Sequence, residues 1–212
     1  MLVIAIDGPA GSGKSTVARA LAARLGLEYL DTGAMYRAVT FAALRHRIDP
    51  ADSEPVAQLS KQIDISIGET VMVDGVDASI EIRGPAVTSA VSLVANNPEV
   101  RSEMVSRQRE WAHSRRGGVL EGRDIGTVVF PDADLKVYLT ASAEVRAKRR
   151  AKEVTDLDYE TVAAELVKRD TYDSGRENDP LRMADDAVNV DTSEKSVDEI
   201  IDLLVALLDG KQ

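Results

Sequence analysis

The sequence predicts an α/β fold built on a parallel sheet, with a small antiparallel sheet inserted into it. Two observations predict the parallel sheet: residues 2–6 form a short apolar run, and a glycine-rich turn and a helical pattern follow directly. Such runs are typical of strands buried on both faces, and the strand–loop–helix order is typical of parallel sheets. A third observation predicts the insertion, because residues 63–83 alternate in polarity and are rich in Ile and Val.

The first part of the chain predicts a strand, a helix, a strand and a helix in that order. After the strand at 2–6, apolar residues recur at helical spacing from Lys14 to Leu25, and Gly26 is a typical stop signal. The stretch LEYLD, residues 27–31, predicts a second short strand. Residues 36–47 are then expected to form a helix. This order is the strand–loop–helix–strand unit of parallel sheets.

The middle of the chain predicts an antiparallel meander followed by helices. Within residues 63–83, the dipeptide Asp-Gly at 74–75 is a hairpin signal between two alternating runs. From residue 85 to residue 111 the pattern is helical, with a break at Asn-Asn-Pro, residues 96–98. We therefore expect a small antiparallel sheet inside the α/β framework, and helices after it.

The last part of the chain returns to alternating strands and helices. Residues 171–186 are polar and are expected to form a loop, of the kind that a ligand can order. The final helix is amphipathic, has a capping signal at its start and ends at Gly210. The expected strands are 119–120, 135–139 and 187–190, and the expected helices are 142–153, 159–168 and one within 191–210.

Composition is that of an ordinary globular protein. The 212 residues suffice for one domain, or for one domain with a sizeable insertion, and 44% of them are apolar and 29% charged. No apolar run is as long as a membrane span, and the apolar start leads directly into a glycine turn without a basic segment before it, so we expect neither a membrane segment nor a signal peptide. There is no cysteine, which fits a reducing, cytoplasmic location.

The net charge of −10 argues against some classes of partner. An acidic chain is a poor candidate for general binding to nucleic acid or to anionic membranes. We therefore expect no nucleic-acid partner and no membrane partner. If a protein of this charge binds phosphates, it must gather some of its 26 Lys and Arg residues locally.

Residues 8–15, GPAGSGKS, match the phosphate-loop pattern G-x-x-x-x-G-K-[ST] in full, between a predicted strand and a predicted helix. Glycines let backbone N–H groups converge on phosphate oxygens, and the helix N-terminus adds partial positive charge. Lys14 would bring a full charge to the β- and γ-phosphates, and the Ser15 hydroxyl would bind Mg²⁺ directly. The sequence thus predicts that the protein binds a nucleoside triphosphate together with Mg²⁺. The predicted ATP-binding residues here are Gly8, Pro9, Ala10, Gly11, Ser12, Gly13, Lys14, Ser15 and Thr16.

The phosphate loop alone leaves GTPase switches, motor ATPases and small-molecule kinases open. A GTPase would be expected to have an N-K-x-D motif that reads guanine, and no such string occurs. A motor ATPase normally ends a strand with several apolar residues and one or two acids, and VLEGRD at 119–124 is only a loose match. A kinase needs a second pocket, and an anionic acceptor needs arginines outside the loop.

Arginines outside the loop are present, and most lie beside a glycine, an aspartate or a strand end. One belongs to EGRD, residues 121–124, whose three charges follow an apolar run, where such groups are seldom buried unless they are paired or bind a ligand. Each arginine taken singly fits a surface position, but the joint pattern favours an anionic acceptor. The set comprises Arg37, Arg101, Arg123, Arg169 and Arg176, with Arg146 and Arg150 four residues apart on one helix face.

Four stretches occur in the order and at the intervals of a known family. They are IDGPAGSGKSTVAR from residue 6, LDTGAMYRAV from residue 30, EGRDIGTVVFPDADLK from residue 121 and RD..DS.R from residue 169. Together they resemble the bacterial cytidylate kinases, a family of nucleoside monophosphate kinases. The resemblance covers nearly the whole chain. GRDIGTVVFPDA is its most specific part, because shikimate, gluconate and dephospho-CoA kinases share the phosphate loop.

The resemblance implies an architecture and a reaction. A P-loop NTPase core with five parallel strands flanked by helices would comprise residues 1–33, 100–147 and 166–212. A monophosphate-binding insertion, residues 34–99, would contain the small antiparallel sheet, and residues 148–165 would form a short lid. The reaction would be ATP plus CMP or dCMP giving ADP plus CDP or dCDP, with UMP a weaker acceptor. The family also suggests a monomer.

The resemblance also implies roles for single residues. Asp124 would accept a hydrogen bond from the exocyclic amine of cytosine, which uracil replaces with an acceptor oxygen. Asp31 and Glu121 would orient waters bound to Mg²⁺. The catalytic residues would be Lys14, Arg123 and Arg176, and Arg146 and Arg150 would lie on the ATP side of the lid. The implied CMP-binding residues are Thr32, Arg37, Ser92, Arg101, Arg123, Asp124, Arg169, Asp173 and Arg176.

Two alternatives stay open from the residues alone. A kinase for another small acceptor, such as UMP or a shikimate-like molecule, would use the same phosphate loop. A nucleotide-binding regulatory module would use the loop without any acceptor. Activity measured across a panel of acceptors distinguishes the first alternative from a cytidylate kinase. ATP turnover that needs no monophosphate would indicate the second.

Overall fold

The computed structural model describes residues 1–153 and 158–210 of the chain. The chain consists of two compact units, each of which makes most of its contacts within itself. The core unit consists of Met1–Tyr29 and Ala112–Gln212, and the insertion unit of Leu30–Trp111. The insertion unit is thus longer than the segment 34–99 that the resemblance implies. Of the implied lid, residues 154–157 lie outside the described residues.

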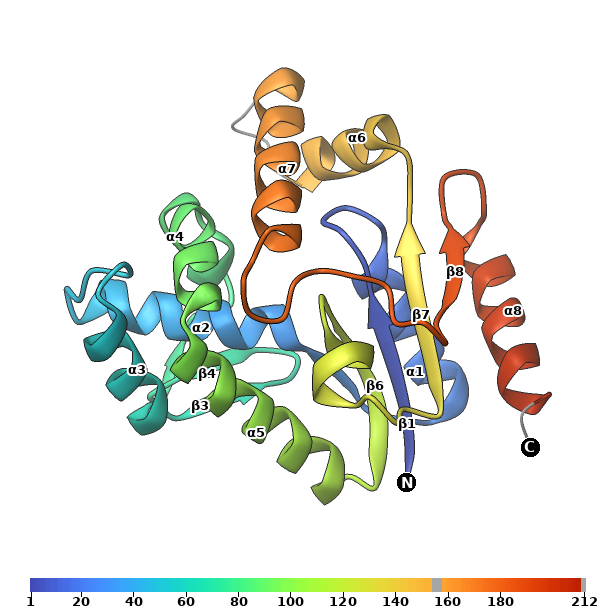
Figure 1. Cartoon of the computed structure of the whole chain (residues 1–212), viewed down its shortest axis with the longest axis horizontal. Coiled ribbons are helices and arrows are strands. Elements are labelled where there is room, and N and C mark those ends of the chain that lie inside the picture. Colours follow the sequence, from blue (N-terminus) through green and yellow to red (C-terminus); the bar gives the residue numbers. More distant parts are fainter. Residues whose placement is uncertain (154–157, 211–212) are drawn as a thin grey trace. The chain divides into compact units, whose positions relative to one another are not determined.

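A five-stranded parallel sheet forms the centre of the core unit (Figure 1). The order is β2-β6-β1-β7-β8; β1 pairs in parallel with β6 and β7, and β7 pairs in parallel with β8. Parallel strands bring their carboxyl ends to one edge, where open α/β sheets bind ligands. The predicted sheet is confirmed. Its strands are β1 Leu2–Asp7, β2 Tyr29–Asp31, β6 Gly117–Gly122, β7 Leu135–Thr140 and β8 Val188–Asp191, and the boundary between the two units falls within β2, after Tyr29.

Two helices complete the main hydrophobic core of this unit, α1 (Lys14–Leu25) and α8 (Val197–Asp209). Ile6 of β1, Leu21 of α1 and Leu204 of α8 belong to one buried cluster, and each has 0% of its surface exposed. Each such side chain contributes roughly 1.5–3 kcal/mol through its removal from water. The phosphate loop therefore leaves a rigidly packed strand and enters a rigidly packed helix.

Both of these helices end or begin where local signals predict. Gly26, with a φ of 65°, terminates α1 and donates to the carbonyl oxygens of the last turn. Ser196 and Glu199 form a reciprocal capping box at the start of α8. Among the described residues, no helix combines the length and the apolar character that crossing a membrane requires.

Three further helical elements follow the strands of the core unit: the π-helical turn η2 (Ile125–Val129), α6 (Ala143–Glu153) and α7 (Tyr159–Ser174). The expectation of a loop from residue 171 is wrong for 171–174, which continue α7. The helix continues because no glycine occurs before Gly175, which caps it. The start of η2 was not predicted, since π-helical turns have no local sequence signal of their own.

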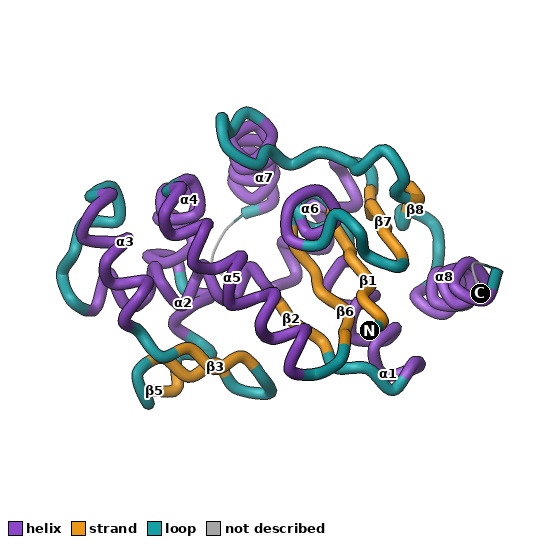
Figure 2. The backbone as a smooth tube through the Cα atoms, turned by 60° about the horizontal axis from the view of Figure 1, so that its bottom comes forward, coloured by secondary structure: helices purple, strands orange, loops and turns teal. Residues whose placement is uncertain are grey.

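The insertion unit combines helices with the predicted antiparallel meander (Figure 2). At the hairpin, Asp74 and Gly75 have φ angles of 48° and 74°, so the Asp-Gly signal is confirmed. The elements are α2 Thr32–Arg45, α3 Ser53–Gln62, β3 Ile65–Ile67, β4 Val71–Val73, β5 Val76–Asp77, the 3₁₀ turn η1 Glu81–Arg83, α4 Pro85–Asn96 and α5 Pro98–Ser114.

Two helices of this unit differ from the prediction. The first, α2, begins at Thr32 rather than residue 36, because the side chain of Asp31 caps it by accepting from the Ala34 amide at 2.9 Å. The second, α3, lies in a segment to which the sequence assigned no element. The predicted break between α4 and α5 is confirmed at Asn97 and Pro98.

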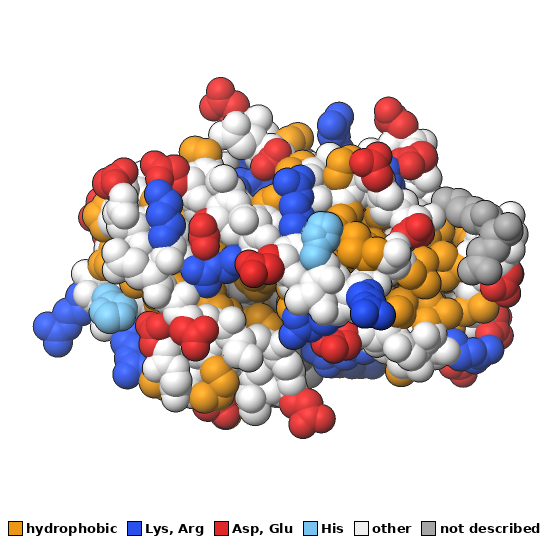
Figure 3. All heavy atoms as spheres, turned by 90° about the horizontal axis from the view of Figure 1, so that it is seen from below, with side chains coloured by type: hydrophobic (Ala, Val, Ile, Leu, Met, Phe, Trp, Pro, Cys, Tyr) orange, Lys and Arg blue, Asp and Glu red, His pale blue; other side chains and the backbone are white. Residues whose placement is uncertain are grey.

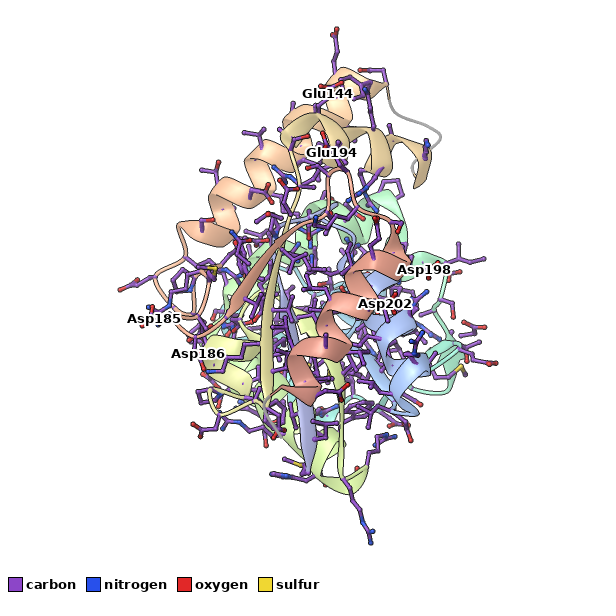
Figure 4. All side chains as sticks on the ribbon, turned by 90° about the vertical axis from the view of Figure 1, so that its right-hand side faces the viewer. Glu144, Asp185, Asp186, Glu194, Asp198 and Asp202 are labelled. Atoms are coloured by element: carbon purple, nitrogen blue, oxygen red, sulfur yellow. The ribbon has the colours of Figure 1, made fainter. Side chains whose placement is uncertain are left out.

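The acidic residues of the core unit lie largely on its surface. Figure 4 shows six of them on α6, on the segment after α7, on the β8–α8 loop and on α8, and all six are exposed. The face in Figure 3 likewise mixes acidic and basic side chains with apolar ones. The labelled residues are Glu144, Asp185, Asp186, Glu194, Asp198 and Asp202. The net negative charge of the chain is therefore compatible with a site inside the unit that is lined by basic side chains.

Candidate active site

The phosphate loop runs between β1 and α1 with the backbone geometry that its glycines predict. Gly11 and Gly13 have φ angles of 74° and 88°, in the left-handed region that favours glycine. A Cβ atom at Gly8 would lie 2.1 Å from the carbonyl oxygen of Leu139, so no side chain fits there. The motif thus has the strand–turn–helix context that phosphate binding requires.

Lys14 is buried beside this loop, with 7% of its surface exposed. Its Nζ donates to the carbonyl oxygen of Pro9 at 2.8 Å. Burial, reinforced by the charge of Arg123, lowers the pKa of Lys14 to about 7, although the charge of Glu121 acts in the opposite direction. A triphosphate bound to the loop would restore the positive charge of this lysine, because nearby negative charge favours the ammonium form.

Two oxygen donors of the core unit suit Mg²⁺, a hard cation that prefers oxygen ligands and keeps several waters. Ser15 lies in the first turn of α1 and is exposed, as is Thr16. Glu121, at the carboxyl end of β6, is 4% exposed and accepts a hydrogen bond from the hydroxyl of Tyr29. A metal ion held by substrate phosphates would find the Ser15 hydroxyl at the start of the helix.

The EGRD stretch connects the end of β6 to η2. Nε of Arg123 donates to Oδ2 of Asp173 at 2.9 Å, and their side chains are 17% and 8% exposed. Asp124 is 5% exposed. The structure therefore brings together Arg123 and Asp173, two residues of the predicted CMP-binding set that are 50 positions apart in the chain.

Three arginines surround the buried carboxylate of Asp173. Besides Arg123, Arg169 approaches it at 3.9 Å and Arg176 at 3.8 Å. Burial acts to raise the pKa of Asp173, but the three arginines outweigh it and hold the pKa below its usual value. Asp173 carries one negative charge against three guanidinium groups, and Asp170 supplies further negative charge near Arg123 and Arg169. The guanidinium groups offer N–H donors of the kind that bind phosphate.

Arg169 is the member of this cluster whose donors are least satisfied. Its Nε is buried and has no hydrogen-bond partner among the described residues. Burial, reinforced by Arg123, lowers the pKa of Arg169 to about 10, and the charge of Arg150 also lowers it. A buried donor without an acceptor is costly, and a substrate oxygen would relieve that cost. This arrangement fits the predicted contact of Arg169 with the acceptor nucleotide.

Arg146 contacts the phosphate loop from α6. It donates through Nε to the carbonyl oxygen of Ala141 and through NH1 to that of Ala10, both at 3.2 Å. It also pairs with Asp170, whose Oδ1 accepts from the Ala10 amide at 3.3 Å. The predicted contact of Arg146 with ATP would have to compete with these bonds. The sequence assigns no role to Asp170, and its signal there is its place beside Arg169 in the stretch RD..DS.R.

A second contact between α6 and the loop runs through Arg149 and Thr192. Arg149 donates to Oγ1 of Thr192 at 2.8 Å and to its carbonyl oxygen at 2.7 Å. The hydroxyl of Thr192 donates to the carbonyl oxygen of Ser12 at 3.0 Å. Neither residue can be selected from the sequence, because their partners are far away in the chain. The helix α6 is thus linked to the loop directly through Arg146 and indirectly through Arg149 and Thr192.

Two arginines of the predicted CMP-binding set are buried within the insertion unit. Arg37 and Arg101 are 8% and 3% exposed. Arg37 donates through NH1 to the carbonyl oxygen of Ile82 and to Oγ1 of Thr88, both at 2.9 Å. The guanidinium of Arg101 lies over the ring of Tyr36, 5.8 Å from its centroid. Buried arginines held in this way are positioned before any ligand binds.

The remaining predicted residues of the insertion unit lie on α2 and α4. Thr32 is the first residue of α2 and is 3% exposed, and Ser92 lies on α4, half-buried. Besides capping α2, Asp31 pairs with Arg83 at 3.2 Å. These contacts give Asp31 a structural role inside the insertion unit, and its predicted role near Mg²⁺ stays a prediction.

One buried residue at the sheet edge was missed from the sequence. Asp7, the last residue of β1, is 5% exposed, and its carboxylate accepts from the backbone amides of Ile125 and Gly126. Burial raises the pKa of Asp7 to about 6, against the lowering effect of those two hydrogen bonds. The available signal was an acidic residue at the carboxyl end of an apolar strand, where ligands bind.

Comparisons with known proteins identify the family of this chain. Residues 4–209 match the family model described as cytidylate kinase. A cytidylate kinase of Nocardia farcinica is 53% identical to this chain, over 96% of the chain and 91% of that protein. Cytidylate kinases of Streptomyces griseus and Mycobacterium avium are 49% and 51% identical, over 100% and 96% of this chain and 94% and 93% of theirs.

Solved structures show the same fold at low identity. An uncharacterized protein from Eubacterium ventriosum has a TM-score of 0.58 at 14% identity, with 99% of each chain covered. A gluconokinase from Sinorhizobium meliloti has a TM-score of 0.50 at 16% identity, with 98% of this chain and 91% of that chain covered. These likenesses bear on the fold alone. The match to the family model and the identity to the curated relatives show that this chain belongs to the cytidylate kinase family.

Proposed function

We propose that this chain transfers the γ-phosphoryl group of ATP to CMP or dCMP, giving ADP and CDP or dCDP. The observation that supports it most is the family match over residues 4–209, which includes both the phosphate loop and the EGRD stretch. A phosphate loop alone would fit many kinases. The buried arginines around Asp173 add a place for an anionic acceptor in the same unit.

The proposed chemistry requires alignment and charge neutralisation more than a catalytic base. The acceptor phosphate is already an anion, so no side chain needs to remove a proton from it. Lys14, the amides of the loop, Mg²⁺ and the arginines Arg123 and Arg176 would offset the charge that develops around the transferred phosphoryl group. Mg²⁺ bound to ATP would supply the largest local charge, with Ser15 as its direct protein ligand.

The proposed specificity depends on the cytosine amine. Asp124 is buried just beyond the carboxyl end of β6, where a carboxylate would accept a hydrogen bond from that amine. The corresponding atom of uracil is an acceptor, which a carboxylate repels. This is why CMP, and not UMP, is the preferred acceptor in the proposal. Arg37, Arg101 and Arg169 would contribute to binding of the acceptor nucleotide.

Two finer assignments belong to the same proposal. Residues 34–99 would bind the monophosphate, and residues 148–165 would act as a lid, with 154–157 outside the described residues. Closure of such a lid would keep water from the reacting phosphates, since water would otherwise hydrolyse ATP. We also propose a monomer that functions in the cytoplasm, with ATP, CMP and dCMP as its small-molecule partners.

A coupled assay of ADP release tests the proposal across acceptors. The panel is CMP, dCMP, UMP, AMP, GMP and shikimate, each with ATP and Mg²⁺, and Lys14→Ala serves as the variant without transfer. We expect the highest kcat/KM with CMP or dCMP. Highest activity with any other acceptor would refute the assignment. ATP turnover that is independent of acceptor would favour a regulatory ATPase instead.

A further inference from the structure

Asp7 connects the phosphate loop with the turn that follows the EGRD stretch, and the proposed reaction depends on both. It is the last residue of β1 and directly precedes Gly8, where the phosphate loop begins. Its Oδ1 accepts from the amide of Ile125 at 2.8 Å, and its Oδ2 accepts from the amide of Gly126 at 2.7 Å. Both amides belong to η2, the turn that follows the EGRD stretch. The proposed function assigns no role to Asp7.

The two hydrogen bonds cap η2 from a different strand. The first amides of any helical turn lack acceptors within the turn and need a cap. Asp124 occupies the N-cap position, where an aspartate normally accepts from such amides itself, yet its side chain makes no capping bond. Asp7 supplies the cap instead. The turn is closed further along by the bond from the Val128 amide to the carbonyl oxygen of Asp124 at 2.9 Å.

Close packing brings η2 within reach of Asp7. A Cβ atom at Gly126 would lie 3.2 Å from the side chain of Lys136 and 3.4 Å from Oδ2 of Asp7, so a larger residue would push the turn away. In the sheet, Asp7 lies opposite Gly122, two residues before Asp124. The carboxylate therefore holds η2 at its start, where the backbone of Asp124 is placed.

Burying the carboxylate of Asp7 costs more free energy than a purely structural cap requires. A buried carboxylate loses its hydration, and the charge of Asp124 adds to that cost while the charge of Lys14 reduces it. An ordinary cap would be Asp124 itself, one residue before the turn. Placing the cap on β1 releases the side chain of Asp124 from capping, while the backbone of Asp124 stays fixed.

We propose that Asp7 is a positioning residue for acceptor recognition: by capping η2 from β1, it sets the carboxylate of Asp124 in register with the phosphate loop. The inference rests on the proposed role of Asp124 in contacting the cytosine amine. It assigns to one side chain the alignment of the donor loop with the residue that selects the acceptor.

Asp7→Asn tests the inference with almost no change in shape. The amide oxygen of asparagine can accept from one backbone N–H, but its NH₂ group would face the other N–H donor. The side chain of Asp124 can then take over the cap that its own position favours. We expect the ratio of kcat/KM for CMP to that for UMP to fall by about tenfold, as for loss of a hydrogen bond to a charged group. The KM for ATP should change by less than about twofold.

Asp134→Asn is a matched control. Asp134, like Asp7, is a carboxylate that accepts from a backbone amide: its Oδ2 accepts from the amide of Val3 at 2.7 Å, at the end of β1 opposite Asp7. We expect its ratio of CMP to UMP use to equal that of the unaltered protein. Amide exchange provides a second measurement, since Asp7→Asn should lower the protection of the Ile125 and Gly126 amides.

A double variant decides whether Asp7 acts through Asp124. If it does, Asp7→Asn should cause no further fall in the CMP-to-UMP ratio once Asp124→Ala is present. An additional, independent fall would overturn the inference, and so would an unchanged ratio in Asp7→Asn alone or a KM for ATP that rises in step. An unchanged ratio in Asp124→Ala would refute the recognition role of Asp124, and this inference with it, whatever Asp7→Asn shows.

Discussion

Burial and neighbouring charge act in opposite directions on Lys14. Its ammonium lies beside Arg123, which disfavours the charged form, and within the influence of Glu121, which favours it. Burial decides the balance and lowers the pKa of Lys14 to about 7. A lysine with this pKa is poised to gain a proton when negative phosphates arrive.

ATP binding should therefore take up a proton at pH 8. At that pH Lys14 is largely neutral before binding, because its pKa is about 7, and the bound triphosphate would restore the charge. Calorimetry of ATP binding in two buffers with different ionisation enthalpies measures the number of protons. We expect close to one proton at pH 8 and clearly fewer at pH 6. Lys14→Arg, which stays charged at both values, should show no uptake; equal uptake in that variant would contradict the explanation.

Asp7 should make the stability of the fold fall as the pH rises from about 4 to about 6. Its pKa is raised from 3.8 to about 6, so the folded state binds the proton more tightly than the unfolded state does in this window. Relative to Asp7→Asn, the free energy of unfolding should decrease by about 3 kcal/mol across it. Urea unfolding of both proteins at several pH values measures the difference, and a difference that does not vary with pH would contradict it.

At the scale of elements, α6 supports the phosphate loop at two points. Arg146 contacts the carbonyl oxygen of Ala10, and Arg149 reaches Ser12 through Thr192. Any movement of α6 would be transmitted to the loop through these bonds. From residue 148 on, α6 belongs to the segment proposed as a lid, so Arg149 and Thr192 would link that segment to the phosphate loop through side chains.

Thr192→Val should weaken ATP binding and leave CMP binding nearly unchanged. The substitution keeps the shape of the side chain but removes the hydroxyl that donates to Ser12 and accepts from Arg149. Loss of such bonds costs about 1 kcal/mol each, so the KM for ATP should rise several-fold. Steady-state kinetics with each substrate varied in turn measures the two KM values. An equal rise in both would show a general loss of structure instead.

Elements with local signals could be predicted from the sequence, and elements held by distant residues could not. Gly26 and the pair Ser196 and Glu199 define the ends of their helices within a few residues of chain. The turn η2 depends on Asp7, which is 118 positions from Ile125. The same distinction applies to the site: the phosphate loop is a local motif, whereas the pairing of Arg123 with Asp173 becomes visible only in the fold.

At the scale of the whole molecule, charge is distributed so that an acidic chain can bind anions. The net charge is −10, and many of the acids are exposed on α6, α8 and the loops beside them. Lys14, Arg123 and Arg176 lie instead at or near the carboxyl edge of the sheet, buried or nearly so. The acidic exterior disfavours general binding of polyanions, while the buried bases suit small phosphates that enter the site.

In the proposed function, the carboxylate of Asp124 selects the acceptor by accepting a hydrogen bond from the amine of cytosine. The most direct measurement compares kcat/KM for CMP and for UMP in the unaltered protein and in Asp124→Ala. We predict that the ratio of the two falls by a factor that corresponds to roughly 1–3 kcal/mol, because only CMP loses a hydrogen bond. Equal losses with both acceptors would contradict the claim.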